Sequence, residues 1–199
     1  MCRLFETIRV ENGKAVSLRW HQQRVEQITS SVELASYIER LSLPSDGVYK
    51  LRIDYDTASG IIGSTLQKYE ERRVKTLKAI RCDTISYPFK YADRQVLDGL
   101  RARRGCCDDV LIIKNAHVTD VTYANILFSA GGRWFTPSTP LLKGTCREKL
   151  LAEGVVTERL ITEEEICCYD NAMLINAMLP FDEARAFPVT GITTSKHSG

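Results

Sequence analysis

The pattern of hydrophobic and polar residues over residues 3–10 is strand-like. Asn12 and Gly13 then provide the two residues with positive φ that a type I′ turn requires, so residues 15–18 are expected to return as a second strand. From about residue 20 to residue 41 the apolar residues recur at steps of three and four, a spacing that predicts one amphipathic helix. The chain therefore opens with a strand pair followed by a helix.

Strand-like patterns dominate the rest of the chain. Strands are expected over 48–55, 61–67, 76–82, 109–114, 124–129, 133–136, 155–161 and 172–175. Helices are expected over 93–103, near Thr145, and after the capping-box sequence at 162–165.

Few helices among many strands indicate an α+β protein with two sub-domains. We expect a small α+β domain at 1–69, a charged interdomain linker at 70–78 and a larger β-rich domain at 79–199. Residues 193–199 are expected to form a loose tail.

Composition narrows the class of protein. An apolar share of 44% in 199 residues is enough for a sizeable buried core. The net charge of +2 is too small to imply a nucleic-acid or membrane partner from charge alone. The apolar runs fall short of a bilayer span, and the opening residues do not have the basic end and apolar stretch of a secretory signal. A cytoplasmic globular protein is expected.

The cysteines do not suggest a metal site. Seven occur, at positions 2, 82, 106, 107, 146, 167 and 168, and their spacing matches neither a zinc site nor a disulfide framework. No two of the three histidines pair at ligand spacing, so no metal is expected. Small buried thiols in a reducing compartment are the favoured interpretation. Only Cys146 has the flanking cation and helix start that a reactive thiol needs.

Two segments could carry chemistry, and each has a structural alternative. Gly144 enters a helix whose first residues include Thr145, which leaves unpaired N–H groups and a hydroxyl for an anion. The alternative is an ordinary capping box from Thr145 to Glu148. Lys90 lies among aromatic residues, and partial desolvation would make its amine a nucleophile or base. Most lysines, however, are simply solvated.

Two further residues are ambiguous in the same way. Asp120 lies between two strand-like segments and is either a turn residue or a buried carboxylate that could meet a cationic ring nitrogen. Asn176 ends an apolar strand, where free backbone amides often meet ligands.

The order of these residues resembles the class IV aminotransferases, a family of pyridoxal-phosphate enzymes that includes branched-chain and D-amino-acid aminotransferases and aminodeoxychorismate lyase. The likeness extends from about residue 5 to residue 180. It rests on Phe5-Glu6-Thr7-Ile8-Arg9-Val10, His21-Gln22-Gln23-Arg24, Lys90, Val118-Thr119-Asp120 with Ala124-Asn125-Ile126, Gly144-Thr145-Cys146-Arg147 and Asn176-Ala177.

This resemblance implies a fold and a site. The fold would be that of D-amino-acid aminotransferase (fold type IV) with two sub-domains, shortened at its N-terminus, and residues 79–199 would form the cofactor-binding domain. Lys90 would form the Schiff base with pyridoxal 5′-phosphate and move the proton between Cα and C4′. Asp120 would keep the pyridinium nitrogen protonated, which makes the ring an electron sink. The resemblance also assigns Arg24, Asn125, Gly144, Thr145, Cys146, Asn176 and Ala177 to cofactor binding.

Two departures from the family limit what can be transferred. The family usually has Glu at the position of Asp120, whose side chain is shorter by one methylene. It also usually begins with an extra strand pair and a glycine-containing loop that help to wall the substrate side, so substrate recognition cannot be carried over.

Three functions are consistent with this resemblance. The first is an aminotransferase that acts on an amino acid or on aminodeoxychorismate through Lys90. The second is aminodeoxychorismate lyase, which releases pyruvate and 4-aminobenzoate; Lys90 followed by Asp93-Arg94 and the segment 176–180 favour it. The third is a catalytically degenerate protein that binds the cofactor or another ligand without turnover. The family also implies a homodimer with a small-molecule amino donor as its partner.

Overall fold

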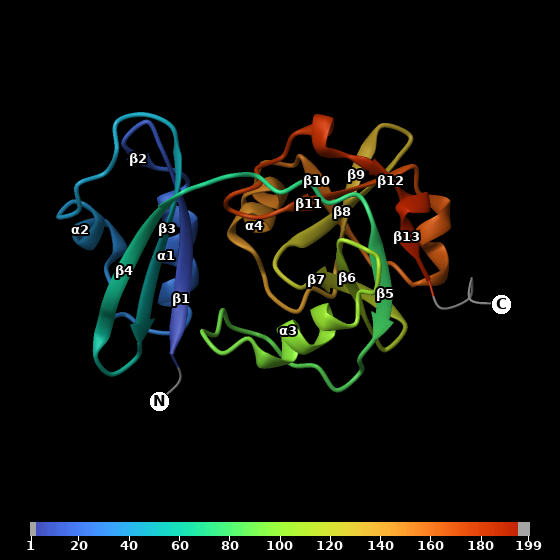
Figure 1. Cartoon of the computed structure of the whole chain (residues 1–199), viewed down its shortest axis with the longest axis horizontal. Coiled ribbons are helices and arrows are strands. Elements are labelled where there is room, and N and C mark those ends of the chain that lie inside the picture. The colour runs from blue at the N-terminus through green and yellow to red at the C-terminus, as the bar shows by residue number, and fades with distance from the viewer. Residues whose placement is uncertain (1–2, 195–199) are drawn as a thin grey trace. The chain divides into compact units, whose positions relative to one another are not determined.

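The computed structural model describes residues 3–194. The chain forms two compact units (Figure 1). Unit 1 comprises the residues up to Glu71 together with Phe89–Asp93, and unit 2 comprises Arg72–Pro88 and the residues from Arg94 onward. These divisions differ from the expected domain bounds in two ways. The short segment around Lys90 packs with unit 1, and the strand of unit 2 that follows the linker already begins at Leu77.

Unit 1 is an antiparallel sheet with helices on one face. Its elements are β1 (Leu4–Glu11), β2 (Lys14–Ala15), α1 (Leu18–Glu26), α2 (Leu34–Ile38), β3 (Val48–Asp56) and β4 (Gly60–Lys68), with the strand order β2-β1-β3-β4. The core of the unit contains Ile8 and Val10 of β1, Leu51 of β3, and Val25 and Ile38 of the two helices. The polar side of the sheet is therefore the face opposite to α1 and α2.

The single helix expected over 20–41 is wrong, because the chain breaks between α1 and α2. The Gln22 side chain holds this break: its Nε2 donates to the Val32 carbonyl (3.0 Å) and its Oε1 accepts from the Leu34 amide (2.9 Å). The Glu33 carboxylate then caps α2 by accepting from the Ala35 amide. The expected return strand at 15–18 is also shorter than predicted, since α1 begins at Leu18.

Unit 2 is mostly β-structure. Its elements are β5 (Leu77–Arg81), α3 (Gln95–Ala102), β6 (Asp109–Lys114), β7 (His117–Val121), β8 (Asn125–Ala130), β9 (Arg133–Pro137), α4 (Thr145–Ala152), β10 (Val156–Arg159), η1 (Glu164–Cys168), β11 (Asn171–Ile175), η2 (Glu183–Arg185), β12 (Phe187–Pro188), η3 (Val189–Gly191) and β13 (Ile192–Thr193). The strand order is β10-β9-β8-β7-β6-β5-β13, with β11 paired to β8 and to β12.

Three strands of unit 2 are absent from the sequence-based expectation, namely β7, β12 and β13. β7 contains Asp120, and β13 contains Thr193, the first residue of the expected tail. Residues 195–199 of that tail lie outside the described residues. The capping box at the start of η1 is confirmed: the Thr162 amide donates to the Glu165 carboxylate at 2.8 Å, and the Glu165 amide donates to the Thr162 hydroxyl at 3.3 Å.

The expectation of buried thiols is wrong for the cysteines that the structure describes. Cys106, Cys167 and Cys168 are exposed, and Cys82, Cys107 and Cys146 are half-buried. Within residues 3–194 no group of three or more His, Cys, Asp or Glu side chains is placed to hold a metal ion. No described helix is long and apolar enough to cross a membrane.

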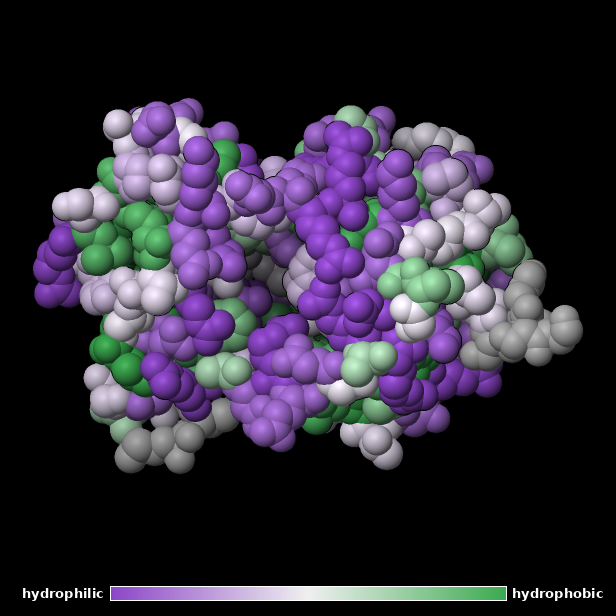
Figure 2. Space-filling view, in the orientation of Figure 1, coloured by the Kyte–Doolittle hydropathy of each residue, from purple (hydrophilic) through white to green (hydrophobic). Residues whose placement is uncertain are grey.

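Hydrophilic residues cover the linker and β5 on the face of the molecule that Figure 2 shows. Arg72, Arg73, Lys75 and Lys78 in these two segments are exposed.

Candidate active site

Arg24 projects from α1 toward a buried acid of the neighbouring strand. Its Nε donates to Glu6 Oε1 (2.9 Å) and its Nη2 donates to Glu6 Oε2 (2.5 Å). His21 Nδ1 also contacts Glu6 Oε2, at 2.6 Å. The Glu6 side chain is fully buried, whereas the Arg24 side chain keeps an exposed fraction of 12%. The acid therefore fixes the direction of the guanidinium that the family resemblance assigns to cofactor binding.

The electrostatics of this cluster keep Glu6 ionised. Burial would raise the pKa of its carboxyl, but the charge of Arg24 and the hydrogen bonds from Arg24 and His21 outweigh burial and lower the pKa to about 2. Burial and the negative charge of Glu6 raise the pKa of Tyr55. Glu6 is thus ionised at physiological pH.

Lys90 lies in a short segment that lengthens the sheet of unit 1. The Phe5 amide donates to the Lys90 carbonyl (3.0 Å), the Ala92 amide donates to the Arg3 carbonyl (2.8 Å), and Leu4 forms a bridge with Tyr91. The half-buried Lys90 places its Nζ 4.7 Å from the centre of the Phe5 ring. The amine therefore contacts an aromatic ring of β1, which is distant from Lys90 in the sequence.

Both ends of the Lys90 loop are anchored within unit 2. Before the segment, Lys114 Nζ donates to the Ile85 carbonyl at 2.7 Å, and Asp83 accepts from the Asn115 amide at 2.7 Å. After it, Arg94 Nη2 donates to the Thr122 carbonyl at 2.8 Å. The residues of unit 2 that flank the segment are thus held by the end of β6 and by the turn that follows Asp120.

Asp120 is a buried carboxylate at the end of β7 and not a turn residue. Its Oδ1 accepts from Asn125 Nδ2 (2.7 Å), and its Oδ2 accepts from the amides of Leu141 (2.8 Å) and Leu142 (3.0 Å). Burial raises the pKa of this carboxyl to about 6, although the three hydrogen bonds and the charge of Arg147 oppose the increase. This acid titrates close to the physiological range.

Asn125 connects Asp120 to the loop that precedes α4. Its Nδ2 also donates to the Leu142 carbonyl at 2.9 Å. The backbone of Gly144 passes so close to Asn125 that a Cβ at residue 144 would lie 2.0 Å from Asn125 Oδ1. Only glycine fits there without displacing the amide, which explains the glycine of this motif by packing.

The start of α4 carries no side-chain cap. Gly144 is the N-cap residue, Thr145 is the first helical residue, and Glu148 pairs with Arg147 (Nη1 to Oε1, 2.5 Å). The expected capping box from Thr145 to Glu148 is therefore wrong. Among residues 3–194 the amides of residues 145–147 have no hydrogen-bond acceptor, as at any uncapped helix start. This end of α4 suits an anion better than the sequence alone indicated.

Cys146 does not have the properties of a reactive thiol. Burial raises its pKa to about 11, and the positive charge of Lys149 only partly opposes that increase. The thiol is protonated at physiological pH, so a nucleophilic role is unsupported.

Asn176 follows β11 and closes a tight turn. Its Oδ1 accepts from the amides of Met178 (2.8 Å) and Leu179 (2.9 Å), and its Nδ2 donates to the Tyr123 carbonyl at 3.3 Å. The side chain is occupied by structure, so any ligand contact of this segment belongs to its backbone, including the half-buried Ala177.

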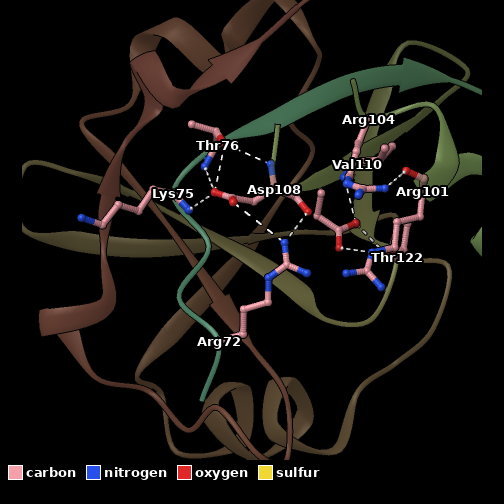
Figure 3. Close-up of polar contacts among 9 residues, drawn as sticks. Arg72, Lys75, Thr76, Arg101, Arg104, Asp108, Val110 and Thr122 are labelled. Atoms are coloured by element: carbon pink, nitrogen blue, oxygen red, sulfur yellow. Dashed lines mark hydrogen bonds and ion pairs between the residues drawn. The ribbon is translucent and has the colours of Figure 1, made fainter. Parts of the chain in front are cut away.

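A buried acid, Asp109, supports the segment that follows Asp120, and Figure 3 labels its partners Thr122 and Val110. Asp109 is fully buried, and its Oδ1 accepts from the Thr122 hydroxyl and the Val110 amide, at 2.7 and 2.8 Å. Its Oδ2 lies 3.2 Å from Arg101 Nε. Thr122, which lies two residues after Asp120, is therefore held by Asp109 through its hydroxyl and by Arg94 through its carbonyl.

Asp108 holds the linker instead. Its Oδ2 accepts from the Lys75 amide (3.0 Å), the Thr76 amide (3.1 Å) and the Thr76 hydroxyl (2.9 Å) (Figure 3). Arg72 donates to its backbone carbonyl.

The structure brings the predicted residues of unit 2 together. In unit 2, Asp120 pairs with Asn125 across β7 and β8, Asn125 pairs with Ile175 at the end of β11, and Gly144 packs on Asn125. Asn176 and Ala177 follow Ile175 directly in the chain, and Thr145 and Cys146 follow Gly144. Arg24 and Lys90 belong to unit 1.

Sequence reasoning missed the residues that support the predicted ones. Glu6 belongs to one of the motifs of the resemblance, which assigns it no role, but a lone acid among the apolar residues of a strand is a signal for a buried ion pair. Thr122 and Asp109 gave no signal, because nothing in their spacing shows that they meet.

The chain belongs to the class IV aminotransferase family, because the amino-transferase class IV model matches residues 3–187. An uncharacterised protein of Haemophilus influenzae is 40% identical over 187 residues, which cover 89% of this chain and 98% of that protein. A candidate 4-amino-4-deoxychorismate lyase from Haemophilus somnus has a similar structure, with a TM-score of 0.76 and 32% identity over 91% of this chain and 98% of that one.

A more distant structure shares the fold. An aminotransferase from Brucella abortus, solved with pyridoxal phosphate bound, has a TM-score of 0.68 and 16% identity over 96% of this chain and 80% of that one. The α+β fold expected from the resemblance to class IV aminotransferases is confirmed.

Proposed function

We propose that this protein is a pyridoxal-phosphate-dependent enzyme that acts on a small amino compound, with Lys90 as its catalytic residue. The observation that carries the proposal is the cluster in unit 2, where a buried acid, an uncapped helix start and a glycine packed against Asn125 occupy adjoining positions. Membership of the class IV aminotransferase family supports the same assignment.

The residues fit this cofactor chemically. The free amides of residues 145–147 suit a phosphate dianion, and the Arg24 guanidinium, directed by Glu6, is the second phosphate ligand that we propose. Asp120 accepts three hydrogen bonds, while a carboxylate has about four lone-pair sites. One site is thus left for a protonated ring nitrogen, and the shorter acid is held in place by Asn125 and the amides of residues 141 and 142.

The protein's own residues would supply orientation and proton movement. Pyridoxal phosphate, held first by the Lys90 amine and then passed to the amino group of the substrate, would supply an electron sink for the charge left when the amino acid loses its Cα proton. Lys90 Nζ would carry that proton, Asp120 would keep a positive charge on the ring nitrogen, and Arg24 with the start of α4 would hold the anionic end.

The test of this proposal is covalent labelling of Lys90. Purified protein incubated with pyridoxal phosphate should gain a visible absorption band and, after borohydride reduction, a mass increase on the peptide that contains residue 90. Lys90→Ala should lose both signals, and Lys14→Ala, a change at an exposed lysine of β2, should keep both. Reduction that labels another lysine and spares Lys90 would contradict the assignment.

A second candidate function is the elimination of pyruvate from 4-amino-4-deoxychorismate to leave 4-aminobenzoate. The similarity to the candidate lyase from Haemophilus somnus favours it. Incubation with aminodeoxychorismate should then release equal amounts of pyruvate and 4-aminobenzoate. An aminotransferase should instead convert the cofactor to its amine form when given an amino acid alone.

We also propose that the enzyme is a cytoplasmic homodimer, as the family resemblance implied. Sedimentation at assay concentrations tests the dimer, and a monomer alone would contradict it.

A further inference from the structure

β1 presents two chemically different faces. Because successive side chains of a strand point to opposite sides, Glu6 and Ile8 lie on the side of the core, whereas Phe5 and Thr7 lie on the other side. On that other face, Phe5 is paired with Asp54 of β3 and Thr7 is paired with Arg52. Arg52 is thus the diagonal neighbour of Phe5.

Two cations contact the same aromatic ring on this face. The Arg52 guanidinium carbon lies 3.8 Å from the centre of the Phe5 ring, and Lys90 Nζ lies 4.7 Å from it. The two groups are therefore at most about 8.5 Å apart. Attraction to the ring face and the register of the sheet both keep them in this arrangement.

Arg52 retains donors beyond those that fix its position. Its Nε and Nη2 donate to the two oxygens of Asp54, at 2.9 and 2.7 Å. Among residues 3–194 its Nη1 has no acceptor, and the side chain is 31% exposed. Arg3 lies 3.7 Å from the same carboxylate, so the charges of Arg3, Arg52 and Asp54 add up to one net positive charge.

We propose that Arg52 binds a carboxylate of the substrate and so selects amino acids over simple amines at Lys90. This inference rests on the proposed function, because it takes Lys90 as the reacting amine. In an amino acid the nitrogen and the carboxylate carbon are about 2.5 Å apart. A charge-assisted bond from a guanidinium to a carboxylate oxygen adds about 2.8 Å. With about 1.3 Å more for each of two bonds, one inside the carboxylate and one inside the guanidinium, this path spans up to about 8 Å, so a substrate nitrogen near Lys90 Nζ brings its carboxylate to Arg52 over nearly all separations below the limit of about 8.5 Å.

The experiment compares two probes that differ in the carboxylate alone. Alanine of either hand and ethylamine are titrated into the holoenzyme, and the change in the visible absorption of the cofactor is followed. The Arg52→Gln variant should need at least tenfold more alanine for the half-maximal change. Its response to ethylamine should shift less than twofold, because ethylamine has no group for Arg52 to bind.

Three further variants separate charge from folding. Arg52→Gln combined with Asp54→Asn removes both partners of the ion pair, so that no unpaired acid remains, and it should show the same selective loss. Arg52→Lys keeps the charge without the planar fork and should lie between the wild type and Arg52→Gln. Arg40→Gln is the matched control, since Arg40 also lies over a ring of unit 1, 5.8 Å from the centre of Tyr37. It should respond like the wild type.

Equal shifts for alanine and ethylamine in the Arg52 variants would overturn the inference, and so would a wild-type holoenzyme without preference for alanine. Neither result affects the proposed cofactor site. A wild-type protein that takes up no pyridoxal phosphate would overturn the proposed function, and this inference would fall with it.

Discussion

Two buried carboxylates of this protein have opposite electrostatic properties. Glu6 faces Arg24 and His21, and its pKa falls to about 2 despite complete burial. Asp120 is surrounded mainly by neutral donors, and burial raises its pKa to about 6. The difference follows from the partners, because a nearby positive charge offsets desolvation more strongly than amide groups do. Glu6 therefore has a constant charge, whereas the charge of Asp120 depends on pH.

The affinity for pyridoxal phosphate should decrease below about pH 6. Below the pKa of about 6, Asp120 becomes protonated and loses the charge that would hold a cationic ring nitrogen. One pH unit below its pKa a carboxyl group is ionised in about a tenth of the molecules. We therefore expect the factor by which Asp120 raises the affinity for pyridoxal phosphate to fall roughly tenfold at pH 5. Dissociation constants measured between pH 4.5 and 8 test this expectation.

The control for the pH dependence is Asp120→Asn, which cannot ionise. It should bind more weakly at pH 8 and should lose the transition near pH 6. A wild-type transition that persists unchanged in this variant would assign it to another group.

At the scale of elements, one turn carries visible backbone strain. The hairpin between β6 and β7 uses Asn115 and Ala116 at φ values of 50° and 65°. Asparagine tolerates the left-handed region, but alanine does so at a cost of about 1–2 kcal/mol. The turn nevertheless holds its neighbourhood, since the Ala116 carbonyl accepts from the Glu163 amide at 3.0 Å.

Ala116→Gly should therefore stabilise unit 2. The side chain is exposed, so no packing is lost. After the larger chain entropy of glycine is subtracted, we expect the free energy of unfolding to increase by about 0.5–1 kcal/mol. Urea denaturation measures the difference. Ala58→Gly, at an exposed turn position without positive φ, should be neutral or destabilising, and a similar gain in both variants would contradict the explanation by strain.

The elements that the sequence predicted well are those whose pattern reflects burial directly. β1, β3, β6 and β11 alternate or are continuously apolar, and their bounds agree closely with expectation. The break between α1 and α2 was not predictable, because the apolar spacing continues across it and the break depends on side-chain contacts of Gln22. β7 was missed because its polar residues are buried; the Thr119 hydroxyl, for example, donates to the Ile112 carbonyl at 2.7 Å.

The residues of the candidate site also fall into those that the sequence predicts and those that it does not. Resemblance pointed to positions such as Lys90, Asp120 and Gly144, whose chemistry is tied to short motifs. The roles of Glu6 and Arg52 depend on which strands pair and in which register, and a single sequence does not contain that information.

At the scale of the whole molecule, Asp108 fixes the end of the linker to unit 2. Three donors from Lys75 and Thr76 converge on one oxygen of this carboxylate, and they lower its pKa. Gly191 packs against the same stretch, where a Cβ would lie 2.3 Å from the Lys75 carbonyl. The last residues of the linker are therefore an ordered part of unit 2.

Asp108→Ala should release this stretch. The amides of Lys75 and Thr76 would lose their acceptor, and local opening should become easier. Trypsin should then cleave after Arg72, Arg73 or Lys75 several times faster than in the wild type, as followed by mass spectrometry. Asp46→Ala, at an exposed site of unit 1, is the control, and equal acceleration in both variants would exclude a specific role for Asp108.

The alternation along β1 has a consequence for how this chain can change. Deleting one residue of β1 between Glu6 and the Asn12-Gly13 turn would shift Phe5 and Glu6 one step along β3 and turn both side chains to the opposite side of the sheet. The same deletion would then remove the contact of Glu6 with Arg24 and the contacts of the Phe5 ring with Arg52 and Lys90. A two-residue deletion would restore the parity of the strand. Natural variation in the length of this segment should therefore occur in even steps.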